Sequence, residues 1–321
     1  MSHKKDTDYL SISSRIRAME TRLLTRDRLE RMIDARDNGE ALKVLAECGY
    51  GELACADSSG LERALSAARE SLFRELSSAL PDGLLLDIFR LKYDYHNAKV
   101  LLKARATGQQ AGRLLVSGGR YDPEQPEQWG DFFRRAVERA EACMDDTVDP
   151  QLMDLLLDKA CFEEMGLLAK QSGSAFLQGY VRLAIDAANL RSRVRCARLE
   201  KSPDFLTQVL MEGGTVSVDA LLRSREPGEL FRVGPLCAAA QLADELSKPG
   251  AGALTAFERE CDNALMAYQE KARRTPFGEE VVAGYLFARE AELTAIRTVM
   301  AGRMAGLDGD VIRNRLRDCY L

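Results

Sequence analysis

The amino-acid sequence predicts an all-α protein built from three similar helical units. Apolar residues recur at spacings of three and four positions along most of the chain, which is the period of an amphipathic helix. The 321 residues include only 9 prolines, while 46% are hydrophobic and 30% are charged, as in a globular protein rich in helix formers. The third observation is a long helical motif that occurs three times, at intervals of roughly a hundred residues.

Residues 1–50 predict a cluster of helices. A stripe with helical spacing runs through the opening segment, at Ile12, Ile16, Met19 and Leu23. A shorter helix follows Thr25, a typical N-cap residue, and another stops at Gly49, a typical C-terminal capping residue.

Two loops rich in helix breakers divide the rest of the chain. Residues 117–123 contain two consecutive glycines and a proline, and residues 201–204 contain Ser202 followed by Pro203. We therefore expect helical units at residues 1–116, 117–202 and 203–321.

The repeated motif is an acid, an asparagine three positions later and a base two positions after that. It occurs as Asp94, Asn97 and Lys99, as Asp186, Asn189 and Arg191, and in a degenerate form as Glu292, Ala295 and Arg297. An apolar stripe accompanies each copy, at Leu91, Tyr95, Ala98 and Leu102, at Leu183, Ala187, Leu190 and Val194, and at Leu293, Ile296 and Met300. The same face of each helix is expected to be buried.

The polar residues of the motif have two possible roles. The residues beside the stripe, namely Asp94, Asn97, Asp186, Asn189 and Glu292, are expected to orient helices within each unit or to cap their ends. The alternative is that they meet a partner across the unit interfaces. The bases Lys99, Arg191 and Arg297 point elsewhere and are candidates for a partner interface. The second copy also carries Arg182, Arg193, Arg195 and Arg198, which predict either a solvated face or a basic rim that contacts an acidic partner.

The sequence predicts neither an enzyme nor a cofactor site. It has no GxxxxGK[ST] loop for a nucleotide, and its eight cysteines, expected to be mostly small core residues, form no CxxC pair for a metal. Of two histidines, His3 lies in a polar tail, and His96 beside Asp94 is better explained as a partly buried structural residue than as a general base. The glycine pair at residues 118–119 resembles an anion-binding loop but is better explained as a surface turn.

Charge and hydropathy indicate the compartment and exclude some partners. The net charge of −5 gives no attraction to nucleic acid. The longest apolar runs fall far short of the roughly 20 residues of a transmembrane helix, and the polar start lacks the apolar core of a secretory signal. We therefore expect a cytoplasmic protein that reaches a membrane only through a partner.

Four segments in the same order resemble a known family, the C subunits of V/A-type rotary ATPases, which correspond to the d subunit of the eukaryotic vacuolar enzyme. They read RIRAMETRLL at residues 15–24, LKYDYHNAKVLL at 91–102, DAANLR at 186–191 and GYLFAREAE at 284–292, the last followed by Ile296 and Arg297. The resemblance covers essentially the whole chain.

The resemblance implies a funnel of three units with pseudo-threefold symmetry. It also implies a non-catalytic component of the central stalk, a socket that couples the rotor shaft, formed by the D and F subunits, to the membrane proteolipid (c/K) ring. Such a protein would sit peripherally on the cytoplasmic face of the membrane and serve ion transport or ATP synthesis. The competing interpretation is a free-standing helical scaffold or regulatory interaction protein.

Overall fold

The computed structural model describes residues 5–50, 57–81, 83–112, 114–147, 150–248 and 250–321 of this protein, and every regular element in these ranges is a helix. The predicted all-α fold is confirmed. The chain forms two compact units, each described by itself below. Unit 1 contains Met1–Pro81, Arg193–Glu200 and Ser224–Leu321, and unit 2 contains Asp82–Ser192 and Lys201–Arg223. The predicted boundaries at residues 116/117 and 202/203, and the threefold symmetry, stay predictions.

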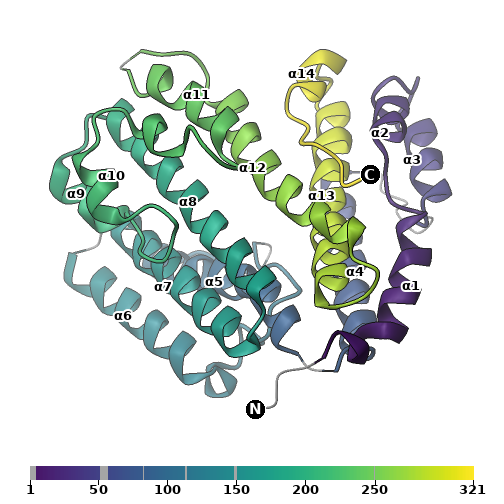
Figure 1. The fold of residues 1–321 in the computed structure, drawn as a ribbon, viewed down its shortest axis with the longest axis horizontal. Helices are drawn as coiled ribbons and strands as arrows, with labels where there is room; N and C mark the ends of the chain where they lie inside the picture. The colour runs from purple at the N-terminus through teal and green to yellow at the C-terminus, as the bar shows by residue number, and fades with distance from the viewer. Residues whose placement is uncertain (1–4, 51–56, 82, 113, 148–149, 249) are drawn as a thin grey trace. The chain divides into compact units, whose positions relative to one another are not determined.

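Unit 1 joins the two ends of the sequence. Its helices are η1 (Asp6–Tyr9), α1 (Leu10–Glu20), α2 (Arg26–Ile33), α3 (Asn38–Glu47), α4 (Ser58–Ser77), η3 (Pro227–Phe231), α11 (Cys237–Leu246), α12 (Thr255–Gln269), η4 (Glu270–Arg274), α13 (Glu279–Met304) and α14 (Gly309–Arg313). The long helix α13 packs against α1, α2, α3 and α4, as well as α12 and α14, and Figure 1 shows α4 running alongside it. Helix α13, near the C-terminus, therefore packs largely against N-terminal helices.

The N-terminal helices begin and end where capping residues predict. Thr25 accepts a hydrogen bond from the backbone N–H of Arg28 at the start of α2, and Asp37 accepts one from Glu40 at the start of α3. Gly49 follows α3 with a φ of 87°, a left-handed conformation that costs glycine little. The predicted start at Thr25 and stop at Gly49 are confirmed.

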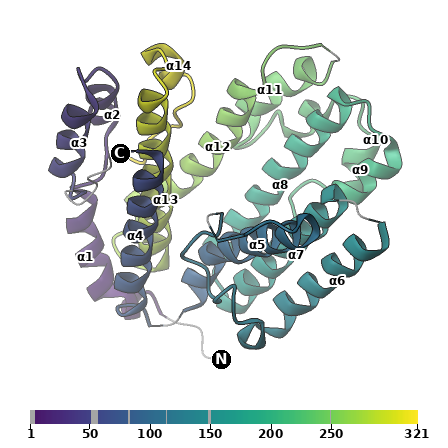
Figure 2. The same cartoon turned by 180° about the vertical axis from the view of Figure 1, so that it is seen from behind.

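Unit 2 is built around two long helices that pack on each other, α5 (Leu84–Thr107) and α7 (Pro150–Ser172). Helix α6 (Asp131–Thr147) packs against α7, as Figure 2 shows. The short helices are η2 (Pro126–Gln128), α9 (Pro203–Val209) and α10 (Val218–Arg223), and α8 (Ala175–Arg198) contributes its first eighteen residues to unit 2 and its end to unit 1.

The apolar stripes of the three long helices are buried in full. Tyr95 on α5 is 2% exposed, Leu190 on α8 is fully buried, and Ile296 on α13 is fully buried, as are their companions at helical spacing. The prediction that the same face is buried each time is confirmed. Of the cysteines, Cys48, Cys161, Cys196 and Cys261 are buried and Cys143, Cys237 and Cys319 are half-buried, while Cys55 and His3 lie outside the described residues.

Candidate functional site

The acid of the first repeat, Asp94 on α5, holds the loop that follows the helix. Its carboxylate accepts hydrogen bonds from the backbone N–H groups of Arg120 at 2.8 Å and Tyr121 at 3.2 Å, and from the Arg120 guanidinium at 2.8 Å. Burial raises the pKa of Asp94 in spite of these donors. The loop at residues 118–120, predicted as a surface turn, is half-buried, and the Arg120 backbone N–H binds a carboxylate of the same chain.

The asparagine of the first repeat fixes a second point on the same loop. The Asn97 side chain donates to the backbone carbonyl of Val116 at 2.9 Å and accepts from its N–H at 2.8 Å. The backbone N–H and C=O of Val116 are thereby both hydrogen-bonded by one side-chain amide, in the way that a neighbouring β-strand would bond them.

A buried ion network surrounds this loop. The Arg120 guanidinium lies between the carboxylates of Asp94 and Glu164, each 2.8 Å away, and all three side chains are at most 9% exposed. Tyr95 donates to Glu164 at 2.8 Å. Although burial opposes its charge, the two carboxylates raise the pKa of Arg120 further above its ordinary value. Neither Arg120 nor Glu164 belongs to the repeat, and neither could be recognised as a member of this network from its local sequence.

An aromatic cluster packs beside the network. The Phe133 ring lies 5.0 Å from Tyr95, 5.4 Å from Tyr121 and 5.1 Å from Trp129, measured between ring centroids. Trp129 is buried and donates to the carbonyl of Asp122.

The histidine beside the first acid lies on the surface. His96 is exposed and contacts the carbonyl of Leu114. The expectation of a partly buried histidine was therefore wrong, because residue 96 is turned well away from the apolar stripe around the axis of α5.

The second repeat reproduces the first with different residues. Asp186 on α8 accepts hydrogen bonds from the N–H groups of Thr215 at 2.9 Å and Val216 at 3.3 Å, and from the Thr215 hydroxyl. Asn189 donates to the carbonyl of Met211 at 2.7 Å and accepts from its N–H at 2.8 Å. The same pair of side chains therefore holds the same kind of loop twice.

Each of these loops contains a glycine pair that fits the carboxylate. The first glycine of each pair, Gly118 or Gly213, has a φ near 100° (104° and 102°). At the second, an added Cβ would lie 2.4 Å from Asp94 Oδ1 at Gly119 and 2.2 Å from Asp186 Oδ1 at Gly214. The second glycine pair was missed in the sequence, although its position after the Asp-x-x-Asn motif is a signal that could have identified it.

The third repeat binds a segment from the other end of the chain. Glu292 on α13 accepts hydrogen bonds from the backbone N–H of Leu24, from the Tyr50 hydroxyl at 2.9 Å and from Arg289 at 2.8 Å. Burial raises its pKa. Ala295 supplies no amide, so the residue between the acid and the base makes no contact of the kind seen at Asn97 and Asn189.

The three bases of the repeat lie apart from these loops. Lys99 pairs with Asp158 on α7 at 2.6 Å, and Arg297 pairs through two hydrogen bonds with Glu62 on α4 at 2.7 and 2.8 Å. Arg191 is half-buried. Their place in a partner interface stays a prediction.

The arginines at the end of α8 mostly bind their own chain. Arg193 donates to the carbonyl of Ser224, Arg195 pairs with Glu258 on α12 at 2.6 Å, and Arg198 donates to the carbonyls of Ala251 and Gly252. Arg182 is exposed.

A groove opens in unit 1 between α12, α13 and α14, and we call it the α12–α14 groove. Its volume is about 760 Å³. We call its charged lining residues the rim, namely Arg195, Glu258, Arg297, Arg315 and Arg317. We call its apolar lining residues the floor, which includes Leu254, Ala301, Gly302, Ala305, Leu307 and Ile312.

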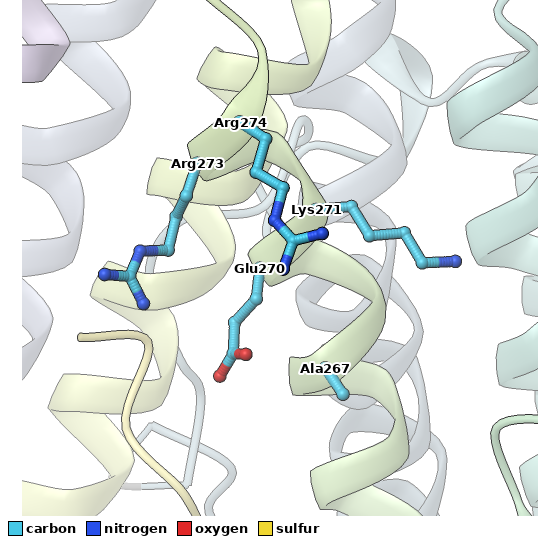
Figure 3. A pocket seen from close by; sticks show the side chains of 5 residues that line it. All are labelled: Ala267, Glu270, Lys271, Arg273 and Arg274. Carbon is cyan, nitrogen blue, oxygen red and sulfur yellow. The ribbon is translucent and has the colours of Figure 1, made fainter.

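A second, smaller depression of about 480 Å³ lies at η4 (Figure 3). Glu270, Lys271, Arg273 and Arg274 line it together with Ala267. Figure 3 shows Lys271 and Arg273 projecting in opposite directions, so their charges do not converge on one point. Burial raises the pKa of Glu270.

Neither a metal centre nor a membrane span is found in the described ranges. No group of three or more His, Cys, Asp or Glu side chains there could hold a metal ion. None of the described helices combines the length and the hydropathy that crossing a bilayer requires.

The comparison with known proteins gives one consistent result. The family model for the ATP synthase (C/AC39) subunit matches residues 12–315. The C subunit of the V-type sodium ATPase of Enterococcus hirae is 26% identical over 332 residues, covering 98% of this chain and 99% of the relative. The C subunit of the V-type ATP synthase of Thermus thermophilus is 26% identical with coverages of 94% and 95%, and the C subunit of the A-type ATP synthase of Haloferax volcanii is 26% identical with coverages of 80% and 82%. Because the family model spans almost the whole sequence, this chain belongs to the ATP synthase (C/AC39) subunit family, the C subunits of V-type and A-type ATP synthases.

Proposed function

We propose that this rotary ATPase subunit is a non-catalytic part of the central stalk. In this role it is a socket that holds the rotor shaft, formed by the D and F subunits, and sits on the proteolipid ring at the cytoplasmic face of the membrane. The observation that carries the proposal is the match over nearly the full length of relatives that are themselves named as C subunits. Torque would pass through the protein between the shaft and the ring.

The buried polar side chains of the three long helices support such a mechanical role. A part that transmits torque must resist deformation, and buried side chains that satisfy backbone groups of distant loops fix those loops in place. Asp94 with Asn97, Asp186 with Asn189, and Glu292 each do this within one unit. We propose that these five residues are architectural, that is, that they orient helices and loops rather than contact a partner.

Assembly with purified partners tests the function. The chain is mixed with the D and F subunits of the shaft and with detergent-solubilised proteolipid ring, and complexes are separated by size-exclusion chromatography. We expect co-elution with both, and restoration of ATP-driven ion uptake when the chain is added to vesicles that contain a motor depleted of it. A chain that elutes alone and restores no transport would favour the free-standing scaffold instead.

The same assay tests Lys99, Arg191 and Arg297 as the partner-facing set. Glutamine is the better substitution, because a glutamate at position 99 or 297 would face Asp158 or Glu62 and repel it. We expect the triple glutamine variant to bind the shaft about tenfold more weakly, with a larger difference from the native chain at low salt. A triple glutamine variant of Arg36, Lys43 and Arg223, which are all exposed and lie outside the candidate set, removes the same number of charges and is the matched control. Unchanged affinity in the triple variant would remove these residues from the interface.

A further inference from the structure

The α12–α14 groove has a chemistry that the coupling function does not account for. Four arginines and one glutamate stand on its rim, so the cations outnumber the acids there. Arg315 is exposed, and no ion pair or hydrogen bond joins its side chain to another residue in the described part of the chain. A guanidinium left in this state is available to a carboxylate from outside.

The other arginines of the rim also keep donors to spare. A guanidinium has five N–H groups, and a carboxylate partner engages at most two or three of them. Arg195 uses one terminal nitrogen on Glu258, and Arg317 uses Nε on Asp262 and one terminal nitrogen on the carbonyl of Arg315. Arg297 engages Glu62 with two of its three nitrogens. Each of them can therefore add an acidic ligand without losing its present partner.

The floor of the groove is apolar, and the part that α13 and its C-cap contribute consists of small residues. Ala301 on α13 and Ala305 at its C-cap lie four positions apart and are exposed, and Leu307 is 40% exposed. The α13 residues of the groove run from Arg297 to Gly302, and Ala305 is the C-cap of the helix. From Arg297 to Ala305 the rise is about 12 Å, or roughly two turns. Small residues over two turns let a second helix approach to the usual interaxial distance of about 8–10 Å.

We propose that the α12–α14 groove binds an acidic amphipathic helix of a partner protein. The apolar face of that helix packs on Ala301, Ala305 and Leu307, and its carboxylates reach the arginines of the rim. The apolar floor favours a peptide over a phosphate or a lipid headgroup, which would leave Leu307 without a partner. The groove shares Arg297 with the proposed shaft interface. The test below therefore uses neither the shaft nor the ring, so that its failure can be told apart from failure of the coupling function.

Binding of a synthetic peptide to the full chain tests the groove. The probe is a fluorescein-labelled helical peptide with leucine and alanine on one face and glutamate on the other, and binding is followed by fluorescence anisotropy. A peptide of the same composition in scrambled order, and one with lysine in place of glutamate, are the peptide controls. We expect the amphipathic acidic peptide to bind and both controls to bind at least about tenfold more weakly.

Substitutions locate the binding to the groove. Arg315→Glu reverses an unpaired charge on the rim, and Ala301→Trp fills the floor without changing the charge; each is expected to weaken binding about tenfold or more. Leu307→Ser, at an exposed position, repeats the test of the floor if the tryptophan variant does not fold. Arg223→Glu, in unit 2 and 83% exposed in its side chain, is the charge-matched control and should leave affinity unchanged.

Three results would overturn the proposal. The first is equal weakening by Arg315→Glu and Arg223→Glu, which would indicate a general effect of charge. The second is equal binding of the scrambled peptide, which would show that the groove does not recognise an amphipathic helix. The third is a failure of the peptide to bind, together with binding of phosphatidylserine vesicles or of a single-stranded oligonucleotide that is lost in Arg315→Glu. That result would make the groove a site for lipid or nucleic acid.

Discussion

At the scale of single residues, the second glycine of each pair decides whether a carboxylate and a loop can meet. Gly119 and Gly214 have no side chain at the point where Asp94 and Asp186 approach the backbone. The carboxylates thereby reach backbone N–H groups that would otherwise be covered. A buried carboxylate that loses its donors costs about 1–3 kcal/mol or more, so the glycines protect a significant part of the stability.

We predict that Gly214→Ala destabilises the protein by about 2–3 kcal/mol. The new Cβ would lie 2.2 Å from Asp186 Oδ1, so either the loop or the carboxylate must move and hydrogen bonds to Thr215 and Val216 are lost. Chemical denaturation followed by circular dichroism measures the change.

The matched control for this prediction is a glycine with space around it. Gly166 lies within α7, and apart from its chain neighbours and the backbone of its own helix no atom lies within 4 Å of an added Cβ. Gly166→Ala should therefore stabilise by about 0.5–1 kcal/mol, since alanine loses less backbone entropy in a helix. Destabilisation of equal size in both variants would show that the clash with Asp186 is not the cause.

Arg120 shows what a residue outside the repeat adds. It places one positive charge between two buried carboxylates, so the network of Asp94, Arg120 and Glu164 carries one net negative charge away from water. Such a network is weak evidence for added stability, because desolvation offsets attraction. Its geometry does fix α5, α7 and the loop after α5 relative to one another, within unit 2.

At the scale of one helix, α13 carries a tyrosine whose ionisation is coupled to folding. Burial raises the pKa of Tyr285 from an ordinary value of 10.0 to about 12, although Arg289 lowers it. The folded state therefore keeps the phenol proton over a range of pH in which the unfolded chain has released it. Stability from this group is complete below pH 10 and is lost as pH rises from 10 towards 12.

We predict that Tyr285→Phe flattens the alkaline decline in stability. In the native protein the free energy of unfolding should fall by about 1 kcal/mol per pH unit through this group between pH 10 and 12. Phenylalanine has no proton to lose, so the variant should fall less steeply over the same interval. Denaturation midpoints measured at several pH values compare the slopes, and parallel slopes would show that Tyr285 does not contribute.

The helices and the acids on them could be predicted from sequence because their signals are local. The stripe through Leu91 and Tyr95 repeats every three to four residues, so one segment suffices to find it. The loops held by those acids could not be predicted in the same way. Val116 and Met211 contact Asn97 and Asn189 through their backbones, and a backbone contact leaves no preference for a side chain at that position.

The structure explains why the third copy of the motif lacks the asparagine. Its loop partner is Leu24, which is 268 residues away from Glu292 along the chain. The first two copies find their partners 19 to 30 residues downstream. The sequence around residue 295 therefore does not indicate which segment Glu292 binds.

At the scale of the whole molecule, the N-terminal segment takes the place in unit 1 that a downstream loop takes at the other two acids. Leu24, Leu29, Met32 and Leu45 lie in one hydrophobic cluster with Leu293 and its neighbours on α13. The stability of α13 therefore depends on residues near the N-terminus of the chain. Contacts this distant in sequence also slow folding, because the intervening chain must be closed first.

We predict that removal of residues 1–50 unfolds α13 but leaves α5 and α7 protected. Without the N-terminal helices, Leu293 and Ile296 would be exposed and the Glu292 carboxylate would lose two of its donors. Hydrogen exchange of backbone amides should show a loss of protection throughout α13 and native rates in α5 and α7. The principal helix contacts of α5 and α7 are with each other, with α6 and with α9, which all lie in unit 2. Addition of a peptide with residues 1–50 should restore protection to α13. If both units lost protection together, the two would form one cooperative structure, and the N-terminal segment would stabilise the whole chain rather than the helix that it covers.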